Sequence, residues 1–172
     1  MAHDNLDNDR EGRRLAEVGK YALSLTVPDP FLDTVAQQMA AVCSTTTVII
    51  SLFSQPSLLL AIAGAPLPLA AKSMFCELAL YLGKYVEVED TLQHPLFKHN
   101  PVVLGSTPIR FFSSTPLMSR DGFILGSLCA LNRRPTRFTP EQREQLSILG
   151  NTVMAYLEDK RTQKRQQNPD SP

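Results

Sequence analysis

The spacing of apolar residues changes several times along this chain, and each change predicts an element. Residues 8–25 show the three- and four-residue spacing of one helix face. Residues 31–42 show the same spacing, after Asp29 as a capping residue and Pro30 in the first turn. Both segments are therefore predicted to be helices, and the stripe of the first consists of Leu15, Val18, Ala22 and Leu25.

Strands are predicted after the second helix. Residues 45–53 are rich in β-branched side chains and lead into Gln55-Pro56, which predicts a strand and a turn. Residues 57–63 are the expected hairpin partner of that strand. Asp121-Gly122 is a strong hairpin signal, and it joins two later segments of strand character. The further predicted strands cover residues 85–88, 109–118 and 123–131.

The segments around these strands complete the pattern. Residues 70–81 predict a short helix, and residues 91–107 form an irregular excursion of a length that usually serves a function. The last helix is predicted to begin with Thr139 as cap, Pro140 in the first position and Gln142 as the acceptor of a capping box. Its apolar stripe is Leu146, Leu149, Val153 and Leu157.

This order of elements predicts an α+β fold. Strands joined by short turns pair antiparallel, so we expect a central antiparallel sheet of five to six strands. The terminal helices would cover one face of it, and the short helix and long loop the other. Three parts are expected: an N-terminal helix and linker over residues 1–30, the domain itself over 31–158, and a disordered polar tail over 159–172.

Composition narrows the class of protein. The 172 residues carry 17 basic and 17 acidic side chains, so the net charge of zero argues against a nucleic-acid partner. The N-terminus lacks the apolar stretch of a secretory signal, and the uncharged run from Thr34 to Ala71 is interrupted by Gly64, Pro66 and Pro68. The three cysteines have no metal-site or disulfide spacing. We therefore expect a cytoplasmic protein without a membrane segment.

Short motifs give no indication of catalysis. The sequence contains neither a glycine-rich phosphate loop nor a hydrolase elbow. His94 and His99 are five residues apart in a loop, unlike the histidine pair of a helical metal site, and Cys76 follows apolar residues that favour a packing role. We expect no metal, no cofactor and no enzymatic activity.

The second half of the chain carries a family resemblance. Its pieces, in order, are Phe75-Cys76, the strand ending at Asp90, His94-Pro95-Leu96-Phe97, Ile109-Arg110-Phe111-Phe112 with Pro116-Leu117, Asp121-Gly122 with Gly126-Ser127-Leu128-Cys129, and Phe138-Thr139-Pro140-Glu141-Gln142. Together they resemble the GAF domain family, the small-molecule sensor modules of bacterial signalling proteins. The resemblance covers about residues 31–157.

The resemblance implies a ligand pocket between the sheet and the 91–107 segment. Strand alternation places Arg110, Phe112 and Ser114 on one face, which we expect to meet that segment. The alternative for Arg110 is a pair with Asp90 or Glu89 at the rim of the sheet. The candidate ligand-binding residues are Phe75, Cys76, Asp90, Phe97, Arg110, Phe112 and Cys129.

Several positions depart from the family pattern. Leu78 stands where a histidine is common in this branch, and Ser114-Thr115 where a glycine is usual. The ligand is therefore expected to be apolar, or absent. Cys76-Glu77 lacks the Cys-His of bilin-binding members, and the cysteines lack the local motifs of the free methionine sulfoxide reductases in this family.

Two functions from different classes follow. The first is a stand-alone GAF domain acting as a cytoplasmic small-molecule sensor or regulatory module, with an unknown ligand and a possible signalling protein as partner. The alternative is a degenerate GAF domain used for protein interaction and dimerisation, with a cysteine-dependent reductase as the third hypothesis. We expect a homodimer through the terminal helices, with Leu15, Val18, Leu146, Leu149, Val153 and Leu157 as contact residues.

Overall fold

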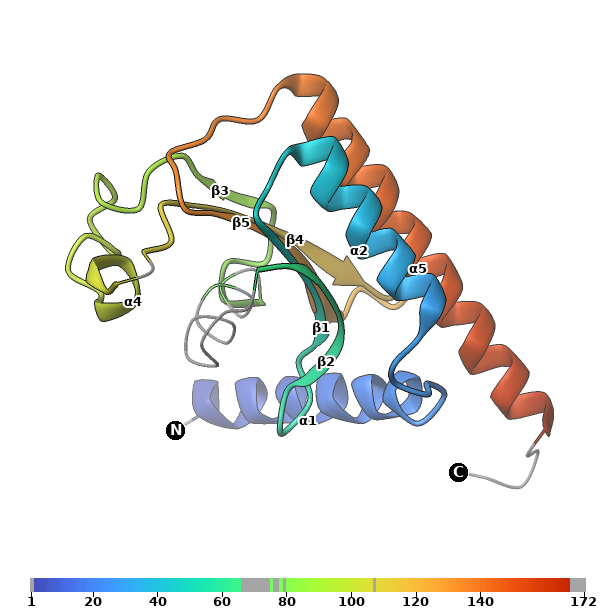
Figure 1. Cartoon of the computed structure of the whole chain (residues 1–172). Coiled ribbons are helices and arrows are strands. Elements are labelled where there is room, and N and C mark those ends of the chain that lie inside the picture. Colours follow the sequence, from blue (N-terminus) through green and yellow to red (C-terminus); the bar gives the residue numbers. More distant parts are fainter. Residues whose placement is uncertain (1, 66–74, 76–77, 79, 107, 168–172) are drawn as a thin grey trace.

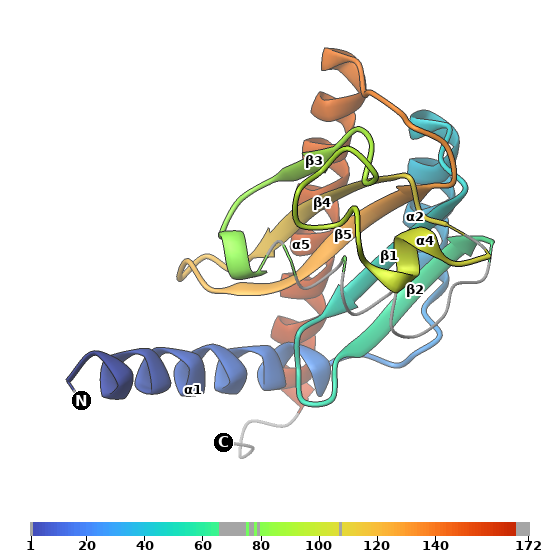
Figure 2. The same cartoon turned by 90° about the vertical axis from the view of Figure 1, so that its left-hand side faces the viewer.

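The chain folds around a five-stranded antiparallel sheet, which confirms the predicted fold class. The computed structural model describes residues 2–65, 75, 78, 80–106 and 108–167, of which 2–8 are described as backbone only. The strands lie in the order β2-β1-β5-β4-β3 (Figures 1 and 2). Their bounds are β1 Thr47–Leu52, β2 Leu58–Gly64, β3 Val86–Val88, β4 Phe111–Met118 and β5 Ile124–Asn132.

Helices cover both faces and one end of the sheet. Helix α2 (Pro30–Cys43) and helix α5 (Pro140–Gln167) lie side by side on one face, and α1 (Ala2–Ala22) crosses beneath one end of the sheet (Figure 1). The short α4 (Pro101–Leu104) belongs to the segment over the other face, and the described residues Phe75, Leu78 and 80–82 are also helical. Among the described residues, no helix is long and apolar enough to span a membrane.

The helix caps have the geometry that the sequence predicted. The carboxylate of Asp29 accepts from the backbone N–H of Phe31 and Leu32 at the start of α2. At α5, Thr139 and Gln142 form a reciprocal capping box: Gln142 N donates to Thr139 Oγ1, and Thr139 N donates to Gln142 Oε1. Both helices therefore begin within one residue of the predicted positions.

Two predictions at the ends of the chain were wrong. Helix α1 begins at Ala2 rather than near residue 8, and it ends at Ala22. Helix α5 does not end near Asp159 but continues to Gln167, so residues 159–167 are helical rather than disordered. For α5 the physical reason is a partner that the sequence pattern does not show: Arg161 Nη1 donates to the carboxylate of Glu17 and to the hydroxyl of Tyr21, both on α1.

The two faces of the sheet carry separate apolar clusters. The face toward α2 and α5, here called the helix face, holds the larger core, which includes Val48, Phe111 and Phe138. The opposite face, here called the distal face, holds a second buried cluster. Alternation along β1 and β4 divides their residues between the two clusters: in β4, Phe111 points to the helices and Phe112 away from them.

Close approach between β1 and β5 requires one glycine. A Cβ at Gly126 would lie 1.9 Å from the carbonyl oxygen of Ser51 and 2.9 Å from the Cα of Leu52. Glycine at this position therefore allows the end of β1, at Leu52, to pair closely with β5.

Candidate functional site

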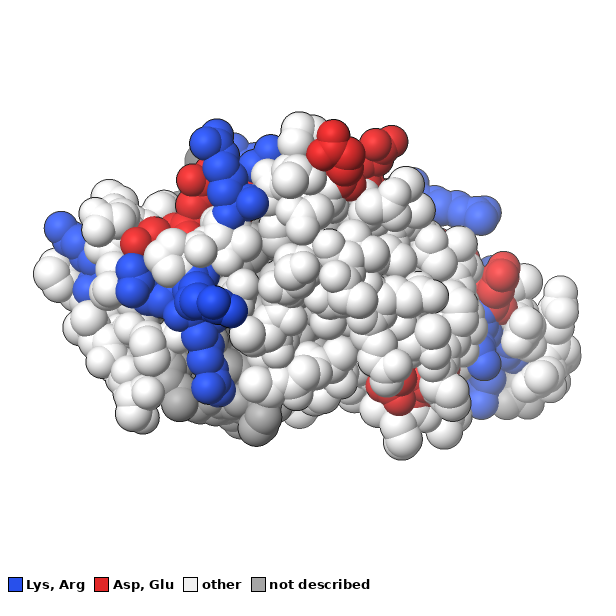
Figure 3. Space-filling model, turned by 45° about the horizontal axis from the view of Figure 1, so that its top comes forward, with Lys and Arg blue, Asp and Glu red and all other residues white. Residues whose placement is uncertain are grey.

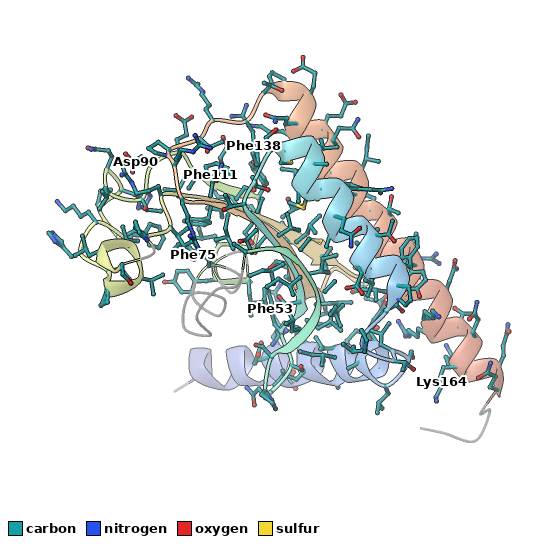
Figure 4. All side chains as sticks on the ribbon, in the orientation of Figure 1. Phe53, Phe75, Asp90, Phe111, Phe138 and Lys164 are labelled. Carbon is teal, nitrogen blue, oxygen red and sulfur yellow. The ribbon has the colours of Figure 1, made fainter. Side chains whose placement is uncertain are left out.

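The distal face is the candidate site. Its buried cluster, here called the distal cluster, draws residues from β1, β3, β4 and β5 and from the segment that follows β3. Figure 4 shows Phe75 on this side of the sheet, and Phe111 and Phe138 toward α2. The members of the distal cluster are Ile49, Phe53, Phe75, Val88, Phe97, Val103, Ile109, Phe112, Cys129 and Leu131.

Three phenylalanines form the centre of the distal cluster. The ring of Phe112 lies 4.7 Å from that of Phe75 and 5.3 Å from that of Phe97, the second pair edge to face. His94 adds a fourth ring, 4.8 Å from Phe97. Aromatic pairs at these separations stabilise one another beyond the area they bury. The residues that the sequence predicted as pocket lining thus come together, but they contact one another directly.

A row of small polar side chains crosses the same face. The hydroxyls of Ser114 and Ser127 each lie 3.2 Å from the sulfur of Cys129. Ser51 is the register partner of Ser127 on the neighbouring strand and lies between Ile49 and Phe53, so it points to the distal face. Ser51 is 7% exposed, and its hydroxyl has no hydrogen-bond partner among the described residues.

An ion pair closes the rim of the site. Arg110 donates from Nε to one oxygen of Asp90 at 3.0 Å and from Nη2 to the other at 2.8 Å. These hydrogen bonds lower the pKa of Asp90 below its usual value. Thr91 adds two bonds beside the pair, from its N–H to the carbonyl of Arg110 and from its hydroxyl to the carbonyl of Ile109. The 91–107 segment is therefore anchored where it begins and where it returns to the sheet.

The structure places the predicted ligand-binding residues in two groups. Phe75, Phe97, Phe112 and Cys129 share the distal cluster. Asp90 and Arg110 form the rim pair that was the alternative interpretation, with side chains 19% and 26% exposed. Cys76 lies outside the described residues. Ser51 and Ser127 were not predicted from the sequence as site residues. For Ser51 a signal was available, because alternation along β1 places it on the same face as the apolar residues Ile49 and Phe53.

The predicted dimerisation residues are largely buried within the chain itself. Val18, Leu146, Val153 and Leu157 are at most 1% exposed and belong to the core of the helix face, and Leu149 packs against that core. Leu15 is half-buried. The reason is that the apolar side chains of α5 pack against α2 and the sheet of the same chain. The end of α5 packs on α1. A contact between two chains through these side chains would require the core to open.

Metal ligation finds no support in this geometry. No group of three or more His, Cys, Asp or Glu side chains with the spacing of a metal site occurs among the described residues. Asp90 is engaged by Arg110, and His94 stacks on Phe97. The site offers hydroxyls, one thiol and aromatic surface, which can hold an organic ligand by packing and hydrogen bonding.

A second polar cluster connects the sheet to α5 and was not predicted. Glu87 on β3 points away from the distal face and accepts two hydrogen bonds from Arg143 of α5. It also accepts from the hydroxyl of Tyr85 at 2.6 Å and from the backbone N–H of Phe138 at 3.2 Å. Burial opposes ionisation of Glu87, but these hydrogen bonds outweigh it and lower its pKa.

Part of the chain is similar in sequence to a known protein. The chain is 45% identical over 65 residues to the cyclic di-GMP phosphodiesterase PA2567 of Pseudomonas aeruginosa, a match that covers 37% of this chain and 11% of that protein. The chain thus corresponds to a small part of that relative.

Solved structures share the fold. The GAF domain of a phosphoenolpyruvate-protein phosphotransferase from Acinetobacter superposes with a TM-score of 0.61 at 21% identity, over 90% of this chain and 94% of that one. A domain of a putative two-component sensor histidine kinase from Sinorhizobium meliloti gives 0.63 at 12% identity, over 84% and 100% of the two chains. The family model described as "GAF domain" matches residues 28–157, most of the sequence. The chain therefore belongs to the GAF domain family.

Proposed function

We propose that this chain is a cytoplasmic regulatory module of a signalling system and that it binds a small organic molecule on its distal face. The observation that carries the proposal is the buried hydroxyl of Ser51, which has no hydrogen-bond partner among the described residues. A buried polar group without a partner costs about 1–3 kcal/mol, so a ligand that supplies the partner is favoured by a similar amount.

The surroundings of Ser51 define the chemistry of that ligand. Ser114, Ser127 and Cys129 extend the polar row, and the buried rings of Phe75, Phe97 and Phe112 belong to the same face. No described member of the distal cluster carries a charge. We therefore propose an uncharged or weakly charged ligand with a flat body and at least one hydrogen-bonding group.

The path from this face to the rest of the molecule runs through β3. Val86 and Val88 contact the distal cluster, whereas Glu87 between them holds Arg143 of α5. A ligand that moves the aromatic rings of the distal cluster beside Val88 displaces β3, and β3 is joined to α5 by the ion pair between Glu87 and Arg143. Such coupling needs a ligand with different affinities for the two arrangements.

Cyclic di-GMP signalling is the proposed context. The support is the relative named as a cyclic di-GMP phosphodiesterase, to which 65 residues of this chain are 45% identical. Under this proposal the chain regulates turnover of that messenger and does not itself catalyse it. The thiols of Cys43 and Cys129 are both buried in the fold.

The test compares two buried serines. Native mass spectrometry of freshly purified protein, followed by thermal-shift measurements with nucleosides, nucleotides and cyclic di-GMP, should identify a ligand. Ser51→Ala should abolish the stabilisation by that ligand without destabilising the free protein. Ser113→Ala is the matched control, because Ser113 is also buried and unpaired among the described residues but points to the helix face. Equal ligand-induced stabilisation of both variants would contradict the proposal.

A second role, pairing with another copy of the chain, is favoured by the outer surface of α2 and α5. Figure 3 shows a broad surface without charged side chains on this side of the molecule. Its exposed members are Gln37, Gln38, Ala41 and Val42 on α2 and Ile148, Asn151, Thr152 and Ala155 on α5. A two-fold contact brings like surfaces together, so an uncharged surface avoids repulsion.

Sedimentation equilibrium tests this pairing. The unmodified protein should have the mass of a dimer at micromolar concentration, and Ile148→Glu should reduce it to that of a monomer. Leu104→Glu, at a residue that is 59% exposed on α4, should leave the mass unchanged. A monomer mass for the unmodified protein would end the proposal.

The reductase hypothesis is not favoured by the described cysteines. Cys43 lies in the core of the helix face and Cys129 in the distal cluster, so the sheet separates them. Burial raises the pKa of Cys43 to about 11, which disfavours the reactive thiolate.

A further inference from the structure

A groove outside the distal face lies between three elements that are distant in sequence. Helix α1, residues 80–83 and the β4–β5 hairpin enclose about 400 Å³. Figure 2 shows the hairpin tip and the helical residues 80–82 above the N-terminal part of α1, at the left of the view. This volume lies within the range of small-molecule sites, about 300–1,000 Å³.

Among the described residues, the charges along the groove leave one cation without a counter-ion. Arg14 is 7% exposed, and its guanidinium is held by Glu11 and by the carbonyls of Phe53 and Ile124. Glu11 and Arg14 therefore neutralise each other. Arg10, one helical turn before Arg14, is exposed and makes no ion pair with any described residue.

The other walls are apolar and partly exposed. Tyr81 is 86% exposed, Met118 46% and Leu82 41%, and Phe123 and Ile124 are half-buried beside them. Solvent exposure of several large apolar side chains around one concavity favours a ligand that covers them. Arg10, which pairs with no described residue, lies at the edge of this surface and favours a negatively charged ligand.

We propose that this groove binds a small amphipathic organic anion, with an aromatic or aliphatic body against Tyr81, Leu82 and Met118 and its carboxylate or sulfonate beside Arg10. The site is separate from the distal face and does not depend on a ligand there. Leu80 and Ile124 line the groove and also contact the distal cluster, so binding at one site reaches the edge of the other.

Two fluorescent probes that differ in charge test the proposal. The anionic probe is 8-anilinonaphthalene-1-sulfonate, and the uncharged analogue is N-phenyl-1-naphthylamine. The unmodified protein should bind the anion more tightly by about threefold to tenfold, the range for a partly exposed charged contact. Arg10→Gln should remove this preference, and Arg10→Glu should nearly abolish binding of the anion.

The control is a neighbouring arginine. Arg13 pairs with Asp9, is exposed and does not line the groove, so Arg13→Gln should leave the affinity for both probes unchanged. Amide chemical shifts should change at Leu82, Gly83 and Phe123 when the anionic probe is added. Equal loss of affinity in both arginine variants, or shift changes confined to Phe112 and Cys129, would overturn the assignment of the groove.

Discussion

Glu87 and Arg143 join the edge strand of the sheet to the terminal helix: Nε and Nη2 of Arg143 donate to the two carboxylate oxygens of Glu87 at 2.8 and 3.0 Å. The Glu87 side chain is 9% exposed and that of Arg143 39%. The contact is thus buried at the sheet and open to solvent at the helix. This ion pair connects α5 with β3, the strand that leads into residues 91–106.

Replacing Glu87 should destabilise the fold in a pH-dependent way. Glu87→Gln removes the charge that holds Arg143, and we expect the free energy of unfolding at pH 7 to fall by about 1–3 kcal/mol. The folded-state pKa of Glu87 is lowered, so its stabilisation is complete above the unfolded pKa of about 4.3 and is lost as the pH falls through the folded value. The difference between the two proteins should therefore shrink below about pH 4.

Urea unfolding at pH 7 and at lower pH measures this difference. Glu144→Gln changes an exposed carboxylate one residue beyond Arg143 and should have little effect at either pH. A constant difference between unmodified protein and Glu87→Gln at all pH values would show that the carboxylate charge is not the stabilising element.

Breaking the ion pair between Arg110 and Asp90 should loosen residues 91–106 without unfolding the domain. Arg110→Gln removes both hydrogen bonds to Asp90, and partly exposed ion pairs contribute only about 1 kcal/mol or less. We expect faster amide hydrogen exchange over residues 91–106, with little change in global stability. Arg137→Gln disrupts the more exposed pair with Glu89 and should not accelerate exchange there.

Alkaline pH should weaken the contact between α1 and α5. The Tyr21 hydroxyl donates to Glu158 at 2.6 Å, and burial together with this carboxylate raises its pKa to about 12. Because the folded pKa is raised, the stabilisation is complete below the unfolded value of about 10 and is lost as the pH rises toward 12. Tyr21→Phe should therefore remove part of the stability loss between pH 10 and 12, measured by circular dichroism during alkaline titration. An unchanged alkaline transition in this variant would refute the assignment.

The described thiols should react slowly in the native protein. Cys43 is 1% exposed and Cys129 is fully buried. In a Cys76→Ser background, alkylation by iodoacetamide should be slow under native conditions and rapid in urea. Rapid native alkylation of either remaining cysteine, located by peptide mass spectrometry, would contradict the packing described above.

Local sequence signals predicted the elements better than their partners. Asp29, Thr139 and Gln142 fixed the starts of α2 and α5, because caps act within one turn of the backbone. Alternation of side chains along β4 correctly predicted that Phe112 lies on the distal face. These features depend on neighbours in sequence, so a single chain is sufficient to predict them.

Features set by distant residues were harder to predict. The tail beyond Asp159 contains polar helix-forming residues, but their order depends on Glu17 and Tyr21, more than a hundred residues away. The apolar residues of α5 have a spacing that fits both a contact between two chains and a contact with the core of one chain. Only the packing of α5 on α2 shows that they belong to the core. That the Ser51 hydroxyl has no partner among the described residues likewise becomes visible only once β1 and β5 are placed side by side.

Helix α5 is long enough that its polar contacts with β3 and with α1 lie far apart. Arg143 is held by β3 near one end and Arg161 by α1 near the other, and the two residues are about 27 Å apart along a helix that rises 1.5 Å per residue. A rotation of α5 by about 5° around Arg143 would carry Arg161 through about 2 Å, enough to break a hydrogen bond to Glu17. A small tilt of α5 where it contacts the sheet would therefore disturb its contact with α1 at the far end.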